Sequence, residues 1–216
     1  MLASCSVPIV QESSDSIVEQ KKEEFRKIIP QTRWERIYFE TINEQTDKSQ
    51  LANIRSKPLP HGDLEVRIWI GFGLGYLQGF ILSQTSGEWA ATYLTAHKQT
   101  IIKLQTPKSG WETAWLKLVN AGLLSLPDAE EINCRVYGRD GESYVAEYNM
   151  NNTYRTYLYD NPHYPVCKEA KQMIEIRNII AEEFDILGKR NFTEPPANLL
   201  EHFKSLNEVI KREKDN

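Results

Sequence analysis

The stretch LEVRIWI, residues 64–70, alternates aliphatic side chains with Glu65, Arg67 and Trp69. Because successive side chains of a β-strand point to opposite faces, a period of two is typical of a strand that buries one face. A helix of the same length would instead repeat its apolar residues every three or four positions. We therefore expect a β-strand here, and the expected fold is built outward from it.

The segments that follow on the C-terminal side predict its neighbours in a sheet. Residues 77–83 and 88–95 have the pattern of two further strands. The connection between them, Thr-Ser-Gly at 85–87, contains a glycine that can supply the positive φ of a tight turn. Together with a short strand at 100–104, these segments form a first meander.

A second meander is expected later in the chain. Its strands are predicted at 132–137, 143–149 and 153–159. The two connections contain Asp140-Gly141 and Asn151-Asn152, and Asp, Asn and Gly tolerate the left-handed backbone of hairpin turns. These strands should therefore pair with their neighbours in sequence.

Helical periodicity marks five further segments. They are 16–29, 32–42, 109–121, 165–187 and 199–210. The first and third begin with the capping-box pattern, Ser16 with Glu19 and Ser109 with Glu112. The second segment also has a strand-like pattern, so its assignment stays open. Residues 43–62 are polar and contain prolines, which is typical of a linker or long loop.

Strands that cluster in runs and connect through hairpins are typical of an antiparallel sheet with helices on one face, an α+β rather than an α/β fold. We expect about six strands in two meanders, with helical extensions at both ends. The chain then divides into four parts: a polar tether (1–15), an N-terminal helical extension and linker (16–62), an α+β core domain (63–188) and a C-terminal helix (189–216).

The composition is that of a globular protein. Of 216 residues, 40% are apolar and 26% are charged, and a chain of this length buries enough surface to fold without a metal or a disulfide. The net charge of -4 provides no positive field that would attract nucleic acid, so no nucleic-acid partner is expected. No stretch approaches the about 18 consecutive apolar residues of a transmembrane helix.

The sequence predicts neither a cofactor nor a metal ion. The glycines of GFGLG (71–75) precede a strand-like segment, whereas the dinucleotide fingerprint requires a helix at that point. The histidines lack the i, i+4 spacing of a helical metal pair. They are His61, His97, His163 and His202.

The N-terminal sequence Leu2-Ala3-Ser4-Cys5 resembles a bacterial lipobox, in which one apolar and two small residues precede the cysteine that becomes diacylated. Residues 6–16 are mostly polar and suit a tether. A secretory signal also needs a basic start and an apolar stretch of about 7–15 residues, whereas four residues precede Cys5. Either the start codon is assigned too late, the upstream part was removed, or the match is accidental. In the first two cases Cys5 is a lipidation site and the protein belongs to the cell envelope. The lipid on Cys5 is then its only expected link to a membrane. In the third case the protein is cytoplasmic.

Lipidation of Cys5 would leave Cys134 and Cys167 as an even pair in an oxidising compartment, where the two can form a disulfide. The alternative is a pair of buried free thiols, because a thiol packs as a small apolar group. The spacing in sequence does not decide between them.

Tyrosine has an uneven distribution, with seven of ten between Tyr137 and Tyr164. The alternation places Tyr144 and Tyr148 on one face of their strand and Tyr157 and Tyr159 on one face of the next. Arg155 lies among them and is expected to pair with Glu147 across the hairpin. These tyrosines and Arg155 are a candidate binding surface for a protein or a glycan, because tyrosine combines apolar area with a hydroxyl group. The simpler explanation is the preference of tyrosine for strands.

Several segments together resemble a group of uncharacterised bacterial envelope proteins. They are the pair Trp111 and Trp115, LLSLPDAE (123–130), DGESYVAEY (140–148), YRTYLYDNP (154–162) and EAKQM (169–173). Members of this group often have a helix with tryptophan, a Leu-Pro-Asp stretch, an Asp-Gly hairpin and a tyrosine-bearing strand before a last helix. The resemblance covers residues 64–184. It implies the α+β fold and an envelope location, and it carries no activity or site residues.

These observations together predict a non-enzymatic bacterial envelope lipoprotein that binds a protein or glycan through the tyrosine-rich sheet. The first alternative is a soluble cytoplasmic interaction or immunity-type protein, for which the lipobox match is accidental. The second is an enzyme with an unrecognised site, which uses carboxylates or histidines that folding brings together. The carboxylates near the hairpins, Asp140, Glu142 and Glu147, are candidates for an acid–base pair. The ordinary roles of these residues are a turn aspartate and solvent-facing strand positions.

Overall fold

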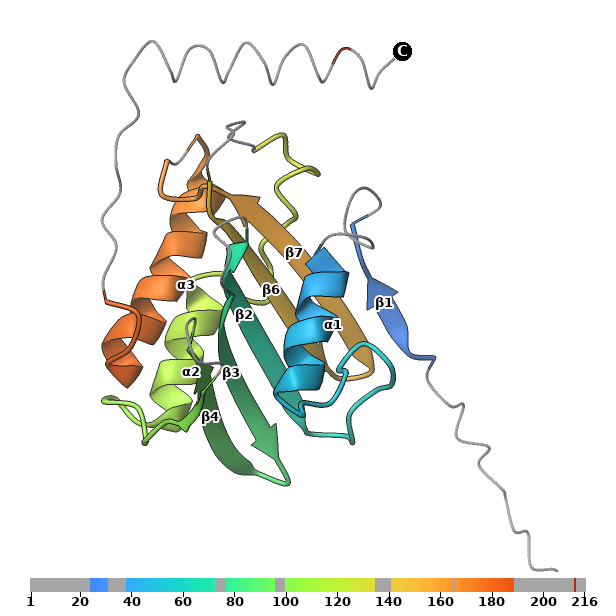
Figure 1. The fold of residues 1–216 in the computed structure, drawn as a ribbon, viewed down its shortest axis with the longest axis vertical. Coiled ribbons are helices and arrows are strands. Elements are labelled where there is room, and N and C mark those ends of the chain that lie inside the picture. Colours follow the sequence, from blue (N-terminus) through green and yellow to red (C-terminus); the bar gives the residue numbers. More distant parts are fainter. Residues whose placement is uncertain are drawn as a thin grey trace, which may run out of the picture.

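The computed structural model describes residues 24–30, 38–72, 77–95, 100–134, 141–164, 166–188 and 212. Within these residues, three helices pack on a seven-stranded sheet with the order β1-β7-β6-β2-β3-β4-β5 (Figure 1). The strands are β1 (Arg26–Ile28), β2 (Leu64–Phe72), β3 (Gln78–Thr85), β4 (Glu88–Leu94), β5 (Ile101–Lys103), β6 (Ser143–Met150) and β7 (Thr153–Asp160); the helices are α1 (Phe39–Lys48), α2 (Trp111–Asn120) and α3 (Lys168–Phe184). The prediction of an α+β fold is confirmed.

The hairpins that the sequence predicts within residues 64–104 and at Asn151-Asn152 are present, whereas no strand forms at 132–134 to pair with β6. Strands β2, β3, β4 and β5 pair antiparallel in order, and β6 pairs antiparallel with β7. The two meanders join through β2 and β6, so that Ile68 lies opposite Phe80 on one side and Ala146 on the other. Asn151 and Asn152 both adopt positive φ in the turn between β6 and β7, as the turn chemistry requires.

The sheet is covered on both faces, so the expectation of helices on one face is wrong. On one face, apolar side chains of the strands form a core with α2 and α3, which include Leu118, Met173 and Ile174 (Figure 1). On the other face, Trp69 and other strand residues form a second core with Phe39 and Ile42 of α1. The helix α1 thus completes a three-layer arrangement.

The sheet is mixed and has one strand more than expected. Residues 26–28, which we expect to be the end of a helix over 16–29, instead form β1 and pair in parallel with β7, with Arg26 opposite Thr153. The helix prediction is therefore wrong for these three residues. The earlier part of that segment lies outside the described residues. A strand this short depends on the edge of β7 for its hydrogen bonds, and this tertiary pairing outweighs the local helical pattern.

Several element boundaries also differ from the predicted ones. Helix α1 begins at Phe39 and extends to Lys48, into the segment assigned to a linker. Residues 132 and 133 lie in a turn and 134 has no regular structure, so none of them starts a strand, and 135–137 are outside the described part. Helix α2 has Gly110 as its N-cap, without the expected capping box, because the Ser109 hydroxyl donates to Glu183.

Helix α3 begins after Cys167, whose Sγ accepts a hydrogen bond from the amide of Ala170. Cys167 is joined to Cys134 by a disulfide, with the two Cα atoms 5.9 Å apart. The disulfide fixes the connection between α2 and β6 at Cys134 to the start of α3. Cys5, the tether (1–15) and the C-terminal segment 199–210 lie outside the described residues.

Candidate functional site

The tyrosines of the expected binding surface are buried. Tyr144, Tyr148, Tyr157 and Tyr159 do share one face of β6 and β7, but their exposed fractions are only 0%, 8%, 0% and 1%. They belong to the core that α3 and the connection between α2 and β6 cover. The prediction that these residues present an exposed binding surface is therefore wrong.

Three tyrosine hydroxyl groups of this cluster instead hold the connection between α2 and β6 on the sheet. They donate to backbone carbonyl oxygens: Tyr157 to Leu123 (2.8 Å), Tyr159 to Pro127 (2.8 Å) and Tyr148 to Leu124 (3.2 Å). Arg155 strengthens the attachment, because its guanidinium donates to the carbonyl oxygens of Leu124 and Leu126. The Leu-Pro-Asp stretch is thus fixed by the side chains that were expected to bind a partner.

We expect Tyr157→Phe to lower the free energy of unfolding by about 1 kcal/mol at neutral pH, because the carbonyl oxygen of Leu123 loses its donor. Burial, and secondly the neighbouring Tyr159, raise the pKa of Tyr157 above its ordinary value of 10.0. Below this value the folded and unfolded hydroxyl groups are both protonated; above it only the unfolded one ionises, so stability falls as the pH rises. Tyr157→Phe should therefore reduce this alkaline loss by about 1.4 kcal/mol per pH unit.

The measurement is urea unfolding between neutral pH and pH 11, with Tyr164→Phe as the control outside the cluster. If the free energy of unfolding falls equally steeply with pH above 10 in the wild type and in Tyr157→Phe, the buried Tyr157 hydroxyl is not the source of the alkaline loss.

Arg155 does not pair with Glu147, contrary to the expectation. In the register of β6 and β7, Arg155 lies opposite Tyr148, whereas Glu147 lies opposite Thr156. Residues directly opposite each other share a face, so the two charged side chains project to opposite faces of the sheet. Arg155 faces α3, and Glu147 faces α1.

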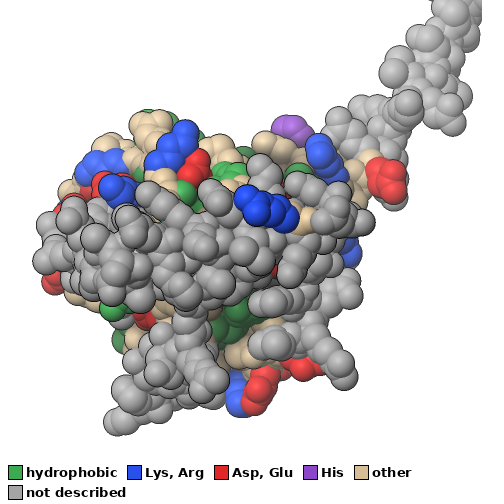
Figure 2. Space-filling view, turned by 90° about the horizontal axis from the view of Figure 1, so that it is seen from above, with side chains coloured by type: hydrophobic (Ala, Val, Ile, Leu, Met, Phe, Trp, Pro, Cys, Tyr) green, Lys and Arg blue, Asp and Glu red, His purple; other side chains and the backbone are tan. Residues whose placement is uncertain are grey.

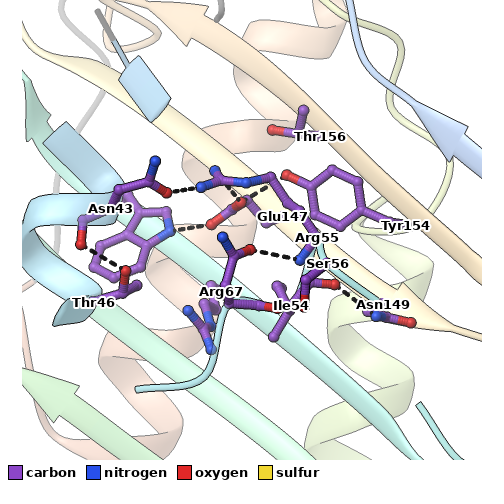
Figure 3. Close-up of polar contacts among 12 residues, drawn as sticks. Asn43, Thr46, Ile54, Arg55, Ser56, Arg67, Glu147, Asn149, Tyr154 and Thr156 are labelled. Atoms are coloured by element: carbon purple, nitrogen blue, oxygen red, sulfur yellow. Dashed lines mark hydrogen bonds and ion pairs between the residues drawn. The ribbon is translucent and has the colours of Figure 1, made fainter. Parts of the chain in front are cut away.

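Glu147 is the centre of a buried polar network between α1 and the sheet (Figure 3). Its carboxylate accepts hydrogen bonds from Trp69 Nε1 (2.6 Å) and the Tyr154 hydroxyl (2.7 Å). It also forms an ion pair with Arg55 Nη1 at 3.2 Å. The exposed fraction of the Glu147 side chain is 1% and that of Arg55 is 12%. Three donors thus compensate for the loss of hydration of this carboxylate.

A glycine on the next strand makes room for the indole of Trp69. Gly79 lies opposite Trp69 in the register of β2 and β3, and a Cβ atom at Gly79 would lie 2.7 Å from Trp69 Cζ3. A larger residue at this position would displace the ring and move Nε1 away from Glu147. The strand residue Gly79 is therefore part of what positions the network.

The network fixes the loop that follows α1 to the sheet. Arg55 also donates to the Asn43 side chain and lies over the Phe39 ring, 4.1 Å from its centroid. Asn149 Nδ2 donates to the carbonyl oxygens of Ile54 (2.7 Å) and Lys57 (2.8 Å). Sequence analysis missed Arg55, Trp69 and Tyr154, because nothing local marks residues that converge only in the folded chain.

The arrangement around Glu147 suits structural support better than chemistry on a substrate. The gap lined by Ile42, Arg55 and Glu147 has an empty volume of about 150 Å³, with no space for a water molecule. Desolvation, and secondly the charge of Glu147, hold the pKa of Tyr154 well above its ordinary value of 10.0, so Tyr154 stays a hydrogen-bond donor. A substrate could reach the carboxylate only if α1 and the following loop moved away.

Other carboxylates of the described residues are also engaged. Glu142 accepts from the Tyr144 hydroxyl at 3.2 Å, and Asp140 lies outside the described residues. Glu183 accepts from Ser109 Oγ (2.9 Å) and Lys117 Nζ (2.6 Å). Although desolvation acts to raise the pKa of Glu183, the hydrogen bonds from Lys117 and Ser109 lower it overall. Glu183 thus joins the start and middle of α2 to the end of α3.

Aromatic side chains that keep some exposed surface gather beside α2. Trp89 of β4 lies 6.4 Å from Trp111 and 5.8 Å from Trp115, measured between ring centroids. All three are half-buried. The next residue of α2, Leu116, is 57% exposed. Among the described residues on the face seen from above, basic side chains lie beside acidic and uncharged ones (Figure 2).

No family model, curated protein or solved structure matches the chain. Among the described residues, no helix is long and apolar enough to cross a membrane. The same residues contain no group of three or more His, Cys, Asp or Glu side chains arranged to hold a metal ion.

Proposed function

We propose that the chain is a non-enzymatic protein of the bacterial cell envelope, anchored through lipidated Cys5, which acts by binding a protein partner. The observation that carries the proposal is the disulfide between Cys134 and Cys167. Disulfides form and persist in oxidising compartments such as the periplasm, whereas cytosolic thiols are kept reduced. The lipobox-like sequence before Cys5 points to the same compartment.

The test of this location uses the gene with its native upstream region, expressed in its host. The mass of the mature N-terminus should show acylated Cys5 as the first residue. Thiol labelling under denaturing conditions should find Cys134 and Cys167 blocked until a reductant is added. An unmodified N-terminus together with two reactive thiols would overturn the proposal and favour a cytoplasmic interaction protein.

The binding surface that fits a protein partner is the outer side of α2. Leu116 is 57% exposed and follows Trp115, which is half-buried against Trp89. An exposed leucine next to aromatic rings suits the apolar centre of a protein interface, where tryptophan is enriched. The tyrosine face cannot serve this purpose, because its side chains are in the core.

We expect a photo-reactive phenylalanine analogue at position 116 to cross-link one distinct protein in envelope fractions. The matched control carries the same analogue at Lys57, which is exposed on the loop after α1. Cross-linking should be strong at position 116 and lost after Trp115→Ala. Equal cross-linking yields at positions 116 and 57 would contradict a binding surface on α2. So would a chain that forms no cross-link to a protein but is retained by purified cell-wall glycan.

A further inference from the structure

The two edges of the sheet differ in how they are closed. At one end, β1 pairs with the first residues of β7. The later part of β7 is covered by the loop before β6, since the Ala129 amide donates to Leu158 O (3.2 Å) and the Leu158 amide donates to Asp128 Oδ2 (2.9 Å). At the other end, β5 is the last strand among the described residues.

The backbone of β5 presents hydrogen-bonding groups outward. The amide of Thr95 donates to Thr100 O (3.1 Å), and the amide of Leu104 donates to Ala91 O (2.9 Å), so both of these pairs are hydrogen-bonded pairs. Hydrogen-bonded and non-hydrogen-bonded pairs alternate along an antiparallel ladder. Ile102 therefore directs its amide and carbonyl groups to β4, whereas those of Ile101 and Lys103 point away from the sheet.

The side chains of this edge are unusually apolar. Ile101 is 45% exposed and Ile102 is 42% exposed, and in the described part of the chain only Leu116 and Ile132 are other large apolar residues with comparable exposure. Proteins usually protect an open edge with charged residues, proline, a bulge or a very short strand. The strand β5 is short, with three residues. Here Lys103 is the single charged residue of the strand.

We propose that β5 pairs antiparallel with β5 of a second copy of the chain, about a two-fold axis at Ile102. In this register, the outward amide and carbonyl groups of Ile101 bond to those of Lys103 of the second copy. Lys103 of the first copy bonds in the same way to Ile101 of the second. The two Ile102 side chains face each other as a non-hydrogen-bonded pair, which is the closer type of pair. Each Lys103 lies opposite an isoleucine, so no like charges meet directly.

A second copy suits this edge because the exposed Ile102 side chains meet each other and each Lys103 avoids the Lys103 of the other copy. The outward groups lie symmetrically on either side of Ile102, and the pairing would join two sheets into one continuous sheet. An isologous contact of this kind uses both β5 edges, so this pairing closes after two copies.

The first test uses the full chain with Cys5→Ser as background and adds Ile102→Cys. Opposed Cα atoms of a non-hydrogen-bonded pair lie about 4.5 Å apart, within the range that a disulfide spans. Mild oxidation should give a covalent dimer in high yield. Ile132→Cys, at a residue that is 38% exposed elsewhere on the surface, is the matched control and should form no covalent dimer, although its β5 edge still associates.

The second test adds Ile101→Pro to the Cys5→Ser chain. Proline removes an outward amide without removing a bond to β4, and edge strands tolerate it where the amide faces away from the sheet. Because two symmetric hydrogen bonds are lost, sedimentation equilibrium should show self-association weakened about 10- to 100-fold, with thermal unfolding little changed. The proposal is overturned if the Cys5→Ser chain sediments as a monomer, if residues 102 and 132 cross-link equally, or if Ile101→Pro leaves the dimer intact.

Discussion

Replacing Cys134 by alanine and Cys167 by serine in one variant is expected to lower the free energy of unfolding by about 4 kcal/mol. The bridge joins residues 33 positions apart, and closing a loop of this length removes much of the conformational entropy of the unfolded chain. Serine is chosen at position 167 because it can keep the cap: the Sγ atom there accepts from the amide of Ala170, and a serine hydroxyl serves the same purpose. The loss then reports on the cross-link rather than on the helix terminus.

Urea unfolding followed by circular dichroism measures this effect. The wild type in the presence of a reductant should unfold at the same urea concentration as the double variant, and the reductant should have no effect on the variant. Hydrogen exchange should increase first in residues 121–134, which the disulfide attaches to α3. Equal stability of the oxidised wild type and the variant would mean that the bridge contributes nothing to the fold.

The strands β2, β3, β4, β6 and β7 could be predicted because their signals are local. A period of two in the side chains, and Asn or Gly in the turns, are properties of short segments that need no partner far away in the sequence. The sharing of one face by Tyr157 and Tyr159 follows from the same periodicity. The periodicity does not predict that α2 and α3 cover this face. It shows which side chains share a face of the sheet, but not which elements pack on that face.

The second buried face was hidden by its polar residues. Glu65 and Arg67 alternate with aliphatic residues in β2, and this pattern normally marks a solvent-facing side. Yet Arg67 is 2% exposed, paired with Glu65 and bonded to the carbonyl oxygen of Ala52. Buried polar groups of this kind are stable only when partners from the loop after α1 reach them, and no local pattern predicts such partners.

Glu147→Leu is expected to lower the free energy of unfolding by about 4 kcal/mol, because it removes the shared acceptor of the buried network. Leucine has nearly the same size as glutamate, so the cavity contribution is small. The loss comes from three donors that lose this acceptor: Trp69 Nε1, the Tyr154 hydroxyl and the guanidinium of Arg55, whose charge is then left with the neutral Asn43 side chain as its hydrogen-bond partner. Removing one partner of a buried ion pair typically costs about 3–5 kcal/mol.

A double-mutant cycle with Arg55→Met separates the ion pair from the other bonds. Arg55→Met alone should be less harmful than Glu147→Leu, since Glu147 keeps two neutral donors. In the double variant no unpaired charge remains, so adding Arg55→Met to Glu147→Leu should recover about 1–2 kcal/mol. If Arg55→Met lowers the free energy of unfolding of the Glu147→Leu variant still further, the two residues contribute independently to stability.

Hydrogen exchange shows where Glu147→Leu acts. If the network fixes the loop after α1, the amides of residues 49–57 should exchange much faster in Glu147→Leu, while those of β3 and β4 change only in proportion to global stability. Glu44→Gln is the control, because Glu44 forms an exposed pair with Lys48 on α1 and exposed pairs contribute at most about 1 kcal/mol. Uniform acceleration in all strands would instead mean that Glu147 supports the sheet as a whole and has no special hold on the loop.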